Sequence, residues 1–287
     1  MTKTIRELLV NEIGESFAPQ SSVYVATSGG VDSSALVLAV KDAGMKPIVT
    51  SFTLDDREST DFRGAKQLAS HFDLPFVPIY IPTDKETITS AIIENMNQYK
   101  VRGKTNIECM YPLLYLMKSI SHKGAKFFIT GLGADGHFCL SKKGMIHYRH
   151  TLQKLQEFKE NHYSGGPLQQ RNILYKASAD LGMNYVDPFW SSDIRTLFWD
   201  SSWEELNKPR EKEPIRASFP ELIPLKLKKH TNLQLGDSGI AETVGEIIRQ
   251  RFPPQALSPV SAYNYIWNNL ESLSKGDGIW TQGTLLK

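Results

Sequence analysis

The residues with the clearest chemical potential lie in the segment ATSGGVDSSALVLAV, residues 26–40. The apolar run before it predicts a strand, and the apolar repeat that ends it predicts a helix. Between them stand two adjacent glycines, three serines and one aspartate. A helix N-terminus offers unpaired N–H groups and the positive end of the helix dipole, so it attracts anions. Because glycine lets the backbone approach a ligand closely, the segment predicts a phosphate cradle.

Asp32 distinguishes this segment from the common nucleotide-binding loops. The lysine of the Walker A loop and the third glycine of the dinucleotide fingerprint are both absent. A bare carboxylate in a phosphate cradle would repel the ligand, but Mg²⁺ binds one or two carboxylates together with phosphate oxygens. The segment therefore predicts a site for a phosphate and Mg²⁺. The alternative interpretation is an ordinary Ser/Gly turn that caps a helix.

The elements that would position this loop alternate between strand and helix patterns. Strands are predicted at residues 23–27, 47–52, 75–81 and 127–130. Helices are predicted at residues 5–17, 33–43, 58–72, 84–98, 107–123, 150–160, 168–181, 239–251 and 259–271. Such alternation is typical of parallel α/β folds. We expect a doubly wound, mostly parallel sheet of about five strands, with a mostly helical C-terminal half packed on it.

Composition excludes several classes of protein. Of the 287 residues, 40% are apolar and 22% are charged, which excludes a disordered or fibrous chain. A formal net charge of +2 gives no argument for nucleic acid. The two cysteines, Cys109 and Cys139, lack metal-ligand spacing and favour a reducing compartment. The N-terminus is too charged for a signal peptide and no apolar run reaches membrane-spanning length, so we expect a cytoplasmic protein without a membrane partner.

The segment SGGVDSS, residues 28–34, resembles the signature Ser-Gly-Gly-x-Asp-Ser of the PP-loop ATP pyrophosphatase superfamily. Four later segments resemble the asparagine synthetase family, in the family's order: TNIECMYPLLYLMKSI (105–120), ITGLGADG (129–136), NYVDPFWSSDI (184–194) and EKEPIRASFPELIP (211–224). The resemblance covers roughly residues 20–250, and the β-lactam and carbapenam synthetases belong to the same branch. It implies an adenine nucleotide alpha hydrolase-like fold that uses ATP and Mg²⁺. The expected parts are an N-terminal helix (1–19), a PP-loop ATP-binding core (20–140) and a helical part that completes the active site (141–287).

By position, the resemblance assigns roles to particular residues. Asp32 and Asp135 would bind Mg²⁺ on the pyrophosphate, and Lys212 would neutralise charge as pyrophosphate leaves. Glu108 is the candidate acid/base, and Lys229 is the candidate second catalytic lysine. The nucleotide would contact a larger set of residues: Ser28, Gly29, Gly30, Asp32, Ser33, Ser34, Ser51, Leu54, Thr130 and Gly131. Each role has a structural alternative, namely a turn residue for Asp135, a buried or capping carboxylate for Glu108 and solvated charges for the lysines.

The chain also departs from the family pattern. The family has glutamates where this chain has Leu132 and Gly136, and Asn232 aligns near the family's second catalytic lysine. A short gap in the alignment would allow Lys226, Lys228 or Lys229 to take the place of that family lysine. A leucine cannot accept a proton or orient an amine, so the resemblance leaves open whether the chain makes asparagine. Because the loop motif begins by Ser28, no glutaminase domain is expected before it. The nitrogen would come from free ammonia, a separate glutaminase subunit or an amine.

These observations predict an ATP-dependent ligase that forms AMP and pyrophosphate. It would adenylate a small-molecule carboxylate and form an amide with ammonia or an amine. One alternative is a PP-loop enzyme that adenylates a nucleobase or tRNA carbonyl, although the chain lacks an obvious basic, aromatic-rich appendage. A second alternative is a nucleotide-binding subunit without catalysis, which the loss of both loop glutamates would favour.

Overall fold

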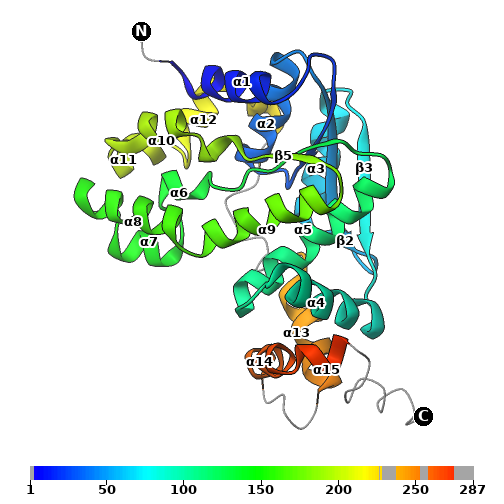
Figure 1. Ribbon diagram of the computed structural model, residues 1–287. Coiled ribbons are helices and arrows are strands. Elements are labelled where there is room, and N and C mark those ends of the chain that lie inside the picture. The colour runs from blue at the N-terminus through cyan, green and yellow to red at the C-terminus, as the bar shows by residue number, and fades with distance from the viewer. Residues whose placement is uncertain (1–2, 226, 228–236, 253–257, 275–287) are drawn as a thin grey trace. The chain divides into compact units, whose positions relative to one another are not determined.

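The strands form one five-stranded sheet with the order β3–β2–β1–β4–β5 (Figure 1). The computed structural model describes residues 3–225, 227, 237–252 and 258–274. β1 pairs in parallel with β2 and β4, and β4 pairs in parallel with β5. The strand bounds are β1 Ser22–Ala26, β2 Lys46–Leu54, β3 Phe76–Ile81, β4 Phe127–Ile129 and β5 Asn184–Val186. The expected parallel sheet of about five strands is confirmed.

The strand order places a topological switch point between β1 and β4. From β1 the chain adds β2 and β3 on one side, and it later adds β4 and β5 on the other. Val25 of β1 lies opposite Ile129 of β4, so both strands end at the same edge of the sheet. Doubly wound sheets bind ligands in the crevice at such a point, beyond the carboxyl ends of the strands. The loops after β1 and β4 are therefore the first place to look for a site.

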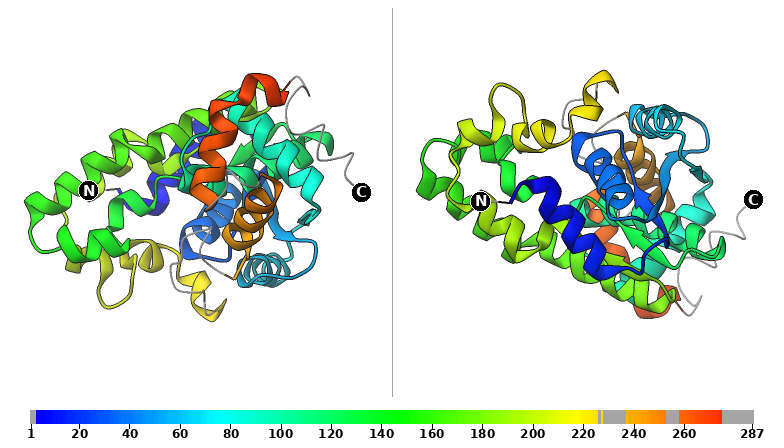
Figure 2. Two further views of the ribbon diagram at one scale, coloured as in Figure 1. Left: turned by 90° about the horizontal axis from the view of Figure 1, so that it is seen from below. Right: turned by 90° about the horizontal axis from the view of Figure 1, so that it is seen from above.

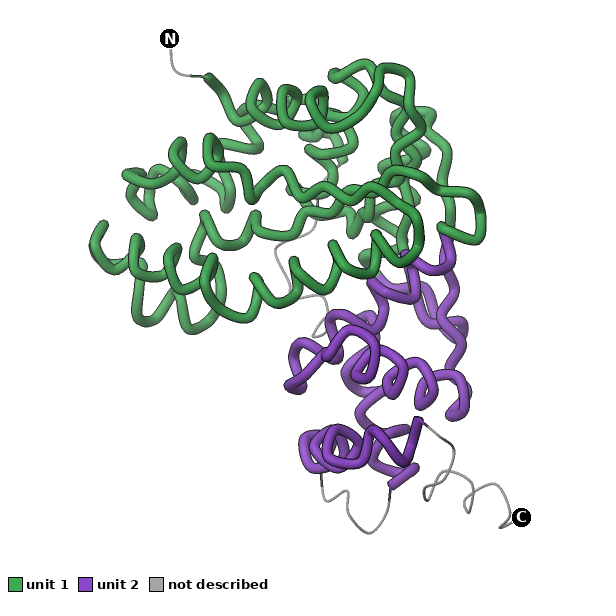
Figure 3. The backbone as a smooth tube through the Cα atoms, in the orientation of Figure 1, with its two compact units in different colours: residues 1–51, 60–78, 121–230 green, residues 52–59, 79–120, 231–287 purple. Residues whose placement is uncertain are grey.

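The chain groups into two compact units, each made of separate segments (Figure 3). The first comprises residues 1–51, 60–78 and 121–230, and the second comprises residues 52–59, 79–120 and 231–287. The last residues of β2 and β3 belong to the second unit. The division into parts at residues 19 and 140 stays a prediction, and the two compact units cross it.

The first unit contains the N-terminal helix and the helix that opens at the Gly/Ser loop. These helices, α1 Ile5–Ser16 and α2 Val31–Asp42, pack against each other (Figure 2). Residues 33–40 of α2 are all buried, which explains the nearly continuous apolar run there. The other helices of this unit are α3 Thr60–His71, α6 Asp135–Phe138, α7 Lys142–His147, α8 Leu152–Ser164, α9 Gly166–Asp180, η1 Pro188–Trp190, α10 Ser192–Trp199, α11 Trp203–Asn207, α12 Glu213–Ser218 and η2 Pro220–Leu225.

The second unit is mainly helical. Its helices are α4 Lys85–Tyr99, α5 Lys104–His122 (whose last two residues belong to the first unit), α13 Ile240–Arg251, α14 Pro259–Asn268 and α15 Leu270–Ser274. α4 packs against α13 and α15, and α13 packs against α14. The hydrophobic face of α13 repeats at helical spacing, since Ile240, Val244 and Ile248 are each fully buried.

The predicted helices and strands agree with the structure to within a few residues at each end. The pattern of residues 184–225 does not predict the short elements there, namely β5, α10, α11 and α12. Short elements carry too few periodic positions for a clear pattern. Among the described residues, no helix is both long enough and apolar enough to cross a membrane.

Candidate active site

The loop after β1 holds the backbone in the form expected for an anion site. Gly30 is the N-cap of α2 and has no side chain that could bond the first-turn N–H groups. The Ser33 hydroxyl accepts a hydrogen bond from the Ser28 N–H (3.2 Å) and donates to the Gly30 carbonyl (3.3 Å). These two bonds fix the curve of the loop from within. Ser34 is fully buried, and its hydroxyl has no hydrogen-bond partner among the described residues.

Gly29 is required both by its conformation and by its neighbour. Its φ of 67° lies in the left-handed region that side chains other than glycine's rarely adopt. A Cβ at this position would lie 2.6 Å from the Cα of Gly64 on α3. Two glycines thus let α3 and the loop touch backbone to backbone. The sequence identified Gly29 as a residue of the loop, but it gave no reason to single out Gly64.

The loop after β4 meets the loop after β1. A Cβ on Gly131 would lie 3.6 Å from the Cβ of Asp32, which is ordinary van der Waals contact. Thr130 is buried, and its hydroxyl is 2.7 Å from the hydroxyl of Tyr185 on β5. The Leu132 N–H also donates to the Thr130 hydroxyl (3.3 Å). The Thr130 side chain therefore stabilises the loop. The resemblance assigns the backbone of Thr130, and not this side chain, to contact with the nucleotide.

Lys212 joins the two aspartates that were predicted to bind Mg²⁺. Its ammonium donates to Asp32 Oδ2 and to Asp135 Oδ1, the latter at 2.6 Å. The three charges come from the first turn of α2, the first residue of α6 and the N-cap of α12. Burial opposes the charged ammonium, but the two carboxylates outweigh it and raise the pKa of Lys212. The structure thus brings together three predicted site residues that lie far apart in the sequence.

Asn207 is a positioning residue that the sequence did not reveal. Its buried amide accepts a hydrogen bond from the Lys212 N–H (3.2 Å) and donates to the carbonyl of Phe138 (3.0 Å). It therefore ties the backbone of Lys212 to the helix that begins at Asp135. Lys212 has a φ of 59°, a conformation that is uncommon for lysine and is held here by these bonds. A lone asparagine in a polar segment gives no signal for this role.

The donor set fits a magnesium ion that nucleotide phosphates help to hold. Asp32 and Asp135 present carboxylate oxygens to one cationic group, and Mg²⁺ prefers such hard oxygen ligands. No group of three or more His, Cys, Asp or Glu side chains with metal-binding geometry occurs within the described ranges. Two protein carboxylates with water and phosphate as the other ligands is the usual arrangement for Mg²⁺. The site therefore suits Mg²⁺ together with a polyphosphate.

Two aromatic side chains leave no room for a Cβ atom at Gly133 and Gly136. A Cβ on Gly133 would lie 2.4 Å from the ring of Trp190, and one on Gly136 would lie 2.3 Å from the ring of His162. The imidazole of His162 thus takes the space beside the loop where the family pattern has a glutamate side chain. Burial lowers the pKa of His162, while the charge of Asp135 acts in the opposite direction. His162 and Trp190 come from α8 and η1, and neither was a candidate from the sequence.

The remaining predicted residues lie elsewhere. Ser51 is buried in the part of β2 that belongs to the first unit, and Leu54 is buried at the end of β2, in the second unit. Glu108 is also in the second unit, where Lys104 donates to it (2.6 Å) and Tyr263 donates to it (3.4 Å). Lys229 lies outside the described residues, as do Lys226, Lys228 and Asn232. Their assignments stay predictions.

Comparison with known families decides the affiliation of the chain. The family model for asparagine synthase matches residues 4–169, which include both loops at the switch point. The chain belongs to the asparagine synthase family. Together with the PP-loop signature, this membership identifies the chain as an ATP-using enzyme of the PP-loop type. The match ends before Lys212, so the role of that residue rests on its contacts with Asp32 and Asp135.

Individual relatives are more distant. The chain is 29% identical over 113 residues to the tRNA-specific 2-thiouridylase MnmA of Rhodospirillum centenum. The aligned segment covers 35% of this chain and only 28% of the length of that relative. The U34-tRNA thiolase NcsA from Methanococcus maripaludis superposes with a TM-score of 0.43 at 10% identity, over 94% of this chain and 78% of that one. The NMN synthetase from Francisella tularensis superposes with a TM-score of 0.35 at 14% identity, over 79% of this chain and 96% of that one. Superpositions of this quality do not bear on function.

Proposed function

We propose that this member of the asparagine synthase family is an AMP-forming carbon–nitrogen ligase. It adenylates the carboxylate of a small molecule with ATP and forms an amide with ammonia or an amine. The observation that carries the proposal is the junction of Asp32, Asp135 and Lys212 at the switch point of the sheet. A polyphosphate with its Mg²⁺ needs both carboxylate ligands and a compensating cation, and this junction supplies both.

In the first step, a carboxylate oxygen of the substrate attacks the α-phosphorus of ATP. The bond between the α-phosphorus and the bridging oxygen breaks, and pyrophosphate leaves with the electron pair. The first-turn N–H groups of α2 and the ammonium of Lys212 stabilise the departing charge. Mg²⁺ bound by Asp32 and Asp135 would supply further charge neutralisation on the phosphate oxygens.

In the second step, the nitrogen attacks the acyl carbon of the acyl-adenylate. The C–N bond forms, AMP leaves and the nitrogen loses one proton to a base. Glu108 was the sequence-based candidate for that base, and its two hydrogen-bond partners favour a structural role as much as a catalytic one. Most of the acceleration would come from positioning and charge stabilisation, because the leaving group is already activated. A separate glutaminase subunit is one source of ammonia that this proposal accommodates.

The test is ATP–pyrophosphate exchange with a library of carboxylic acids, followed by mass measurement of the products when ammonia or amines are added. We expect exchange with a subset of the acids and its loss in the Asp32→Asn variant, which keeps the size of the side chain but removes its charge. A protein that binds ATP but gives no exchange with any acid would be the non-catalytic nucleotide-binding subunit considered above.

A second candidate is adenylation of a carbonyl on a nucleobase or tRNA. It is favoured by the partial similarity to a tRNA-specific 2-thiouridylase. It predicts that transfer RNA, and none of the carboxylic acids, stimulates pyrophosphate release. RNA binding that weakens steeply as the salt concentration rises would accompany it. The same exchange assay, run with RNA in place of the acids, separates the two functions.

A further inference from the structure

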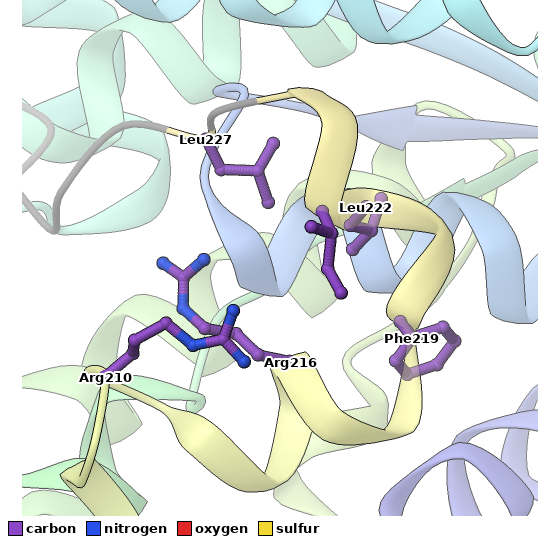
Figure 4. A pocket seen from close by; sticks show the side chains of 6 residues that line it. Arg210, Arg216, Phe219, Leu222 and Leu227 are labelled. Carbon is purple, nitrogen blue, oxygen red and sulfur yellow. The ribbon is translucent and has the colours of Figure 1, made fainter.

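A pocket of about 190 Å³ on the first unit is lined by two arginines on one side and apolar side chains on the other (Figure 4). The arginines are Arg210 and Arg216, whose guanidinium groups lie side by side. The apolar wall consists of Phe219, Leu222, Ile223 and Leu227. Arginine binds phosphate oxygens through its planar fork of N–H donors, and an apolar wall strengthens that attraction by excluding water. The lining therefore suits an anion.

The two guanidinium groups differ in how their charge is compensated. Arg210 forms a bidentate pair with Glu213, at 2.9 Å for each bond. Arg216 is half-buried, and its Nε donates only to the backbone carbonyl of Glu211 (2.8 Å). Among the described residues, no carboxylate bonds to the terminal N–H groups of Arg216. Burial first and the charge of Arg210 second lower the pKa of Arg216. An anion in the pocket would relieve both effects.

The pocket lies beside the predicted nucleotide site. The backbone N–H of Arg216 donates to the carbonyl of Lys212 (3.2 Å), so the two residues are one helical turn apart. The carboxylate of Asp32 is close enough to raise the pKa of Arg216 against the effect of burial. α12 carries Arg216, and η2 carries Leu222 and Ile223. Both elements pack against α2, the helix that opens at the Gly/Ser loop. The pocket's Arg216 thus lies one helical turn from Lys212, on the same helix.

We propose that the Arg210–Arg216 pocket receives pyrophosphate as it leaves the ATP site. This inference rests on the proposed function, because it assigns the path of the leaving group in the adenylation step. Pyrophosphate carries several negative charges, and Lys212 together with the first turn of α2 can compensate only part of them. Arg216 adds a second cation, one helical turn beyond Lys212. In this arrangement the terminal phosphate of ATP would be the part that reaches Arg216. The substrate carboxylate has no reason to occupy this pocket, since it must lie at the α-phosphate.

The test measures pyrophosphate binding by calorimetry in the presence of Mg²⁺, using the full-length protein. Arg216→Met should weaken binding by about tenfold or more, the range expected for the loss of a charge-assisted hydrogen bond. AMP binding should stay unchanged, because AMP lacks the terminal phosphates. The control is Arg149→Met, since Arg149 is exposed, does not line the pocket and stacks over the ring of Trp203.

A second pair of variants tests the pocket without altering an arginine. Ile223 lines the pocket and is 59% exposed, so a polar substitution there leaves the core intact. Ile223→Glu should weaken pyrophosphate binding, and Ile223→Lys should preserve or strengthen it. Opposite effects of the two charges support the proposal, because a loss of folding would weaken binding in both variants. Wild-type affinity for pyrophosphate in both Arg216→Met and Ile223→Glu would overturn it, as would equally tight binding of orthophosphate.

Different results would contradict the pocket assignment and the proposed function. If wild-type protein catalyses exchange but Arg216→Met is inhibited by pyrophosphate as strongly as wild type, the function stands and the pocket assignment is wrong. If pyrophosphate binding depends on Arg216 but no carboxylic acid supports exchange, the pocket assignment stands and the ligase function is wrong.

Discussion

Two buried charged side chains, one in each unit, form ion pairs of different kinds. Lys212 joins two carboxylates that lie 180 and 77 residues away in the chain, in the helices that follow two neighbouring strands. Glu108 pairs with Lys104 one turn earlier on the same helix and accepts a further bond from Tyr263. The first arrangement assembles three charges from separate elements beside a switch point, where a charged ligand can rearrange them. The second satisfies one carboxylate with its own neighbours. Convergence of distant charges, more than burial, marks the candidate active site.

The largest expected effect concerns Lys212. Lys212→Met keeps much of the apolar length of the side chain but removes the charge that compensates Asp32, Asp135 and the leaving group. We expect the rate of ATP–pyrophosphate exchange to fall by about 10²–10³-fold, as for other lost groups that stabilise transition-state charge. Lys118→Met is the matched control, because Lys118 is exposed and pairs with a single carboxylate, Glu94. Exchange at the wild-type rate in Lys212→Met would remove the distinction between the two ion pairs.

The loop backbone should be the next most sensitive feature. Gly29→Ala forces a Cβ against the backbone of Gly64 and strains a positive φ, so we expect ATP affinity to fall by more than about tenfold. Gly44→Ala is the control, since Gly44 has a φ of 79° but open space around the added Cβ. It should lower the free energy of unfolding by about 1 kcal/mol and leave ATP affinity unchanged. Equal affinity losses in both variants would show that global strain, and not the contact with Gly64, is responsible.

Glu108→Gln tests the second ion pair directly. The amide keeps the shape of the side chain but removes the buried charge that accepts from Lys104 and Tyr263. We expect the free energy of unfolding to fall by about 1–2 kcal/mol, measured by urea denaturation. Exchange activity should stay within about threefold of wild type. A large loss of amide formation with unchanged stability and unchanged exchange would instead identify Glu108 as the base of the second step.

The last prediction is a pH dependence of stability from His137, whose ring, like the Glu108 carboxylate, has hydrogen-bond partners close by. Burial lowers the pKa of His137 to about 3, while its Nε2 lies 3.0 Å from the Phe189 carbonyl. The unfolded chain, with a histidine pKa near ~6.5, binds a proton that the folded chain does not between about pH 6.5 and 3. Stability should therefore fall as the pH drops through this window, by up to ~1.4 kcal/mol per pH unit. His137→Asn should reduce this slope in urea denaturation measured at pH 7, 6 and 5, and an unchanged slope would contradict the prediction.

Much of the fold followed from local patterns. The apolar run of α2 and the strand pattern before it were clear because their periodicity repeats over many residues. The loop residues Gly29, Gly30 and Asp32 stand out because they lie between those two apolar patterns, where a strand meets a helix. The short elements between residues 184 and 225 were not placed, since three to eight residues seldom show a period.

The sequence by itself determined where to expect a ligand and predicts its type: two glycines and an aspartate between a strand and a helix indicate a polyphosphate with Mg²⁺. Only the tertiary structure decided which distant residues complete the site. Asn207, His162 and Gly64 were not candidates, and they reach the site through packing between elements that are far apart in the chain. Lys212 was a candidate, but only the structure shows that it bonds both Asp32 and Asp135. The physical reason is that a local pattern depends on neighbours in sequence, whereas charge compensation and close backbone contact depend on neighbours in space. The Arg210–Arg216 pocket also depends on neighbours in space, because the spacing of two arginines in the sequence does not predict that they line one pocket.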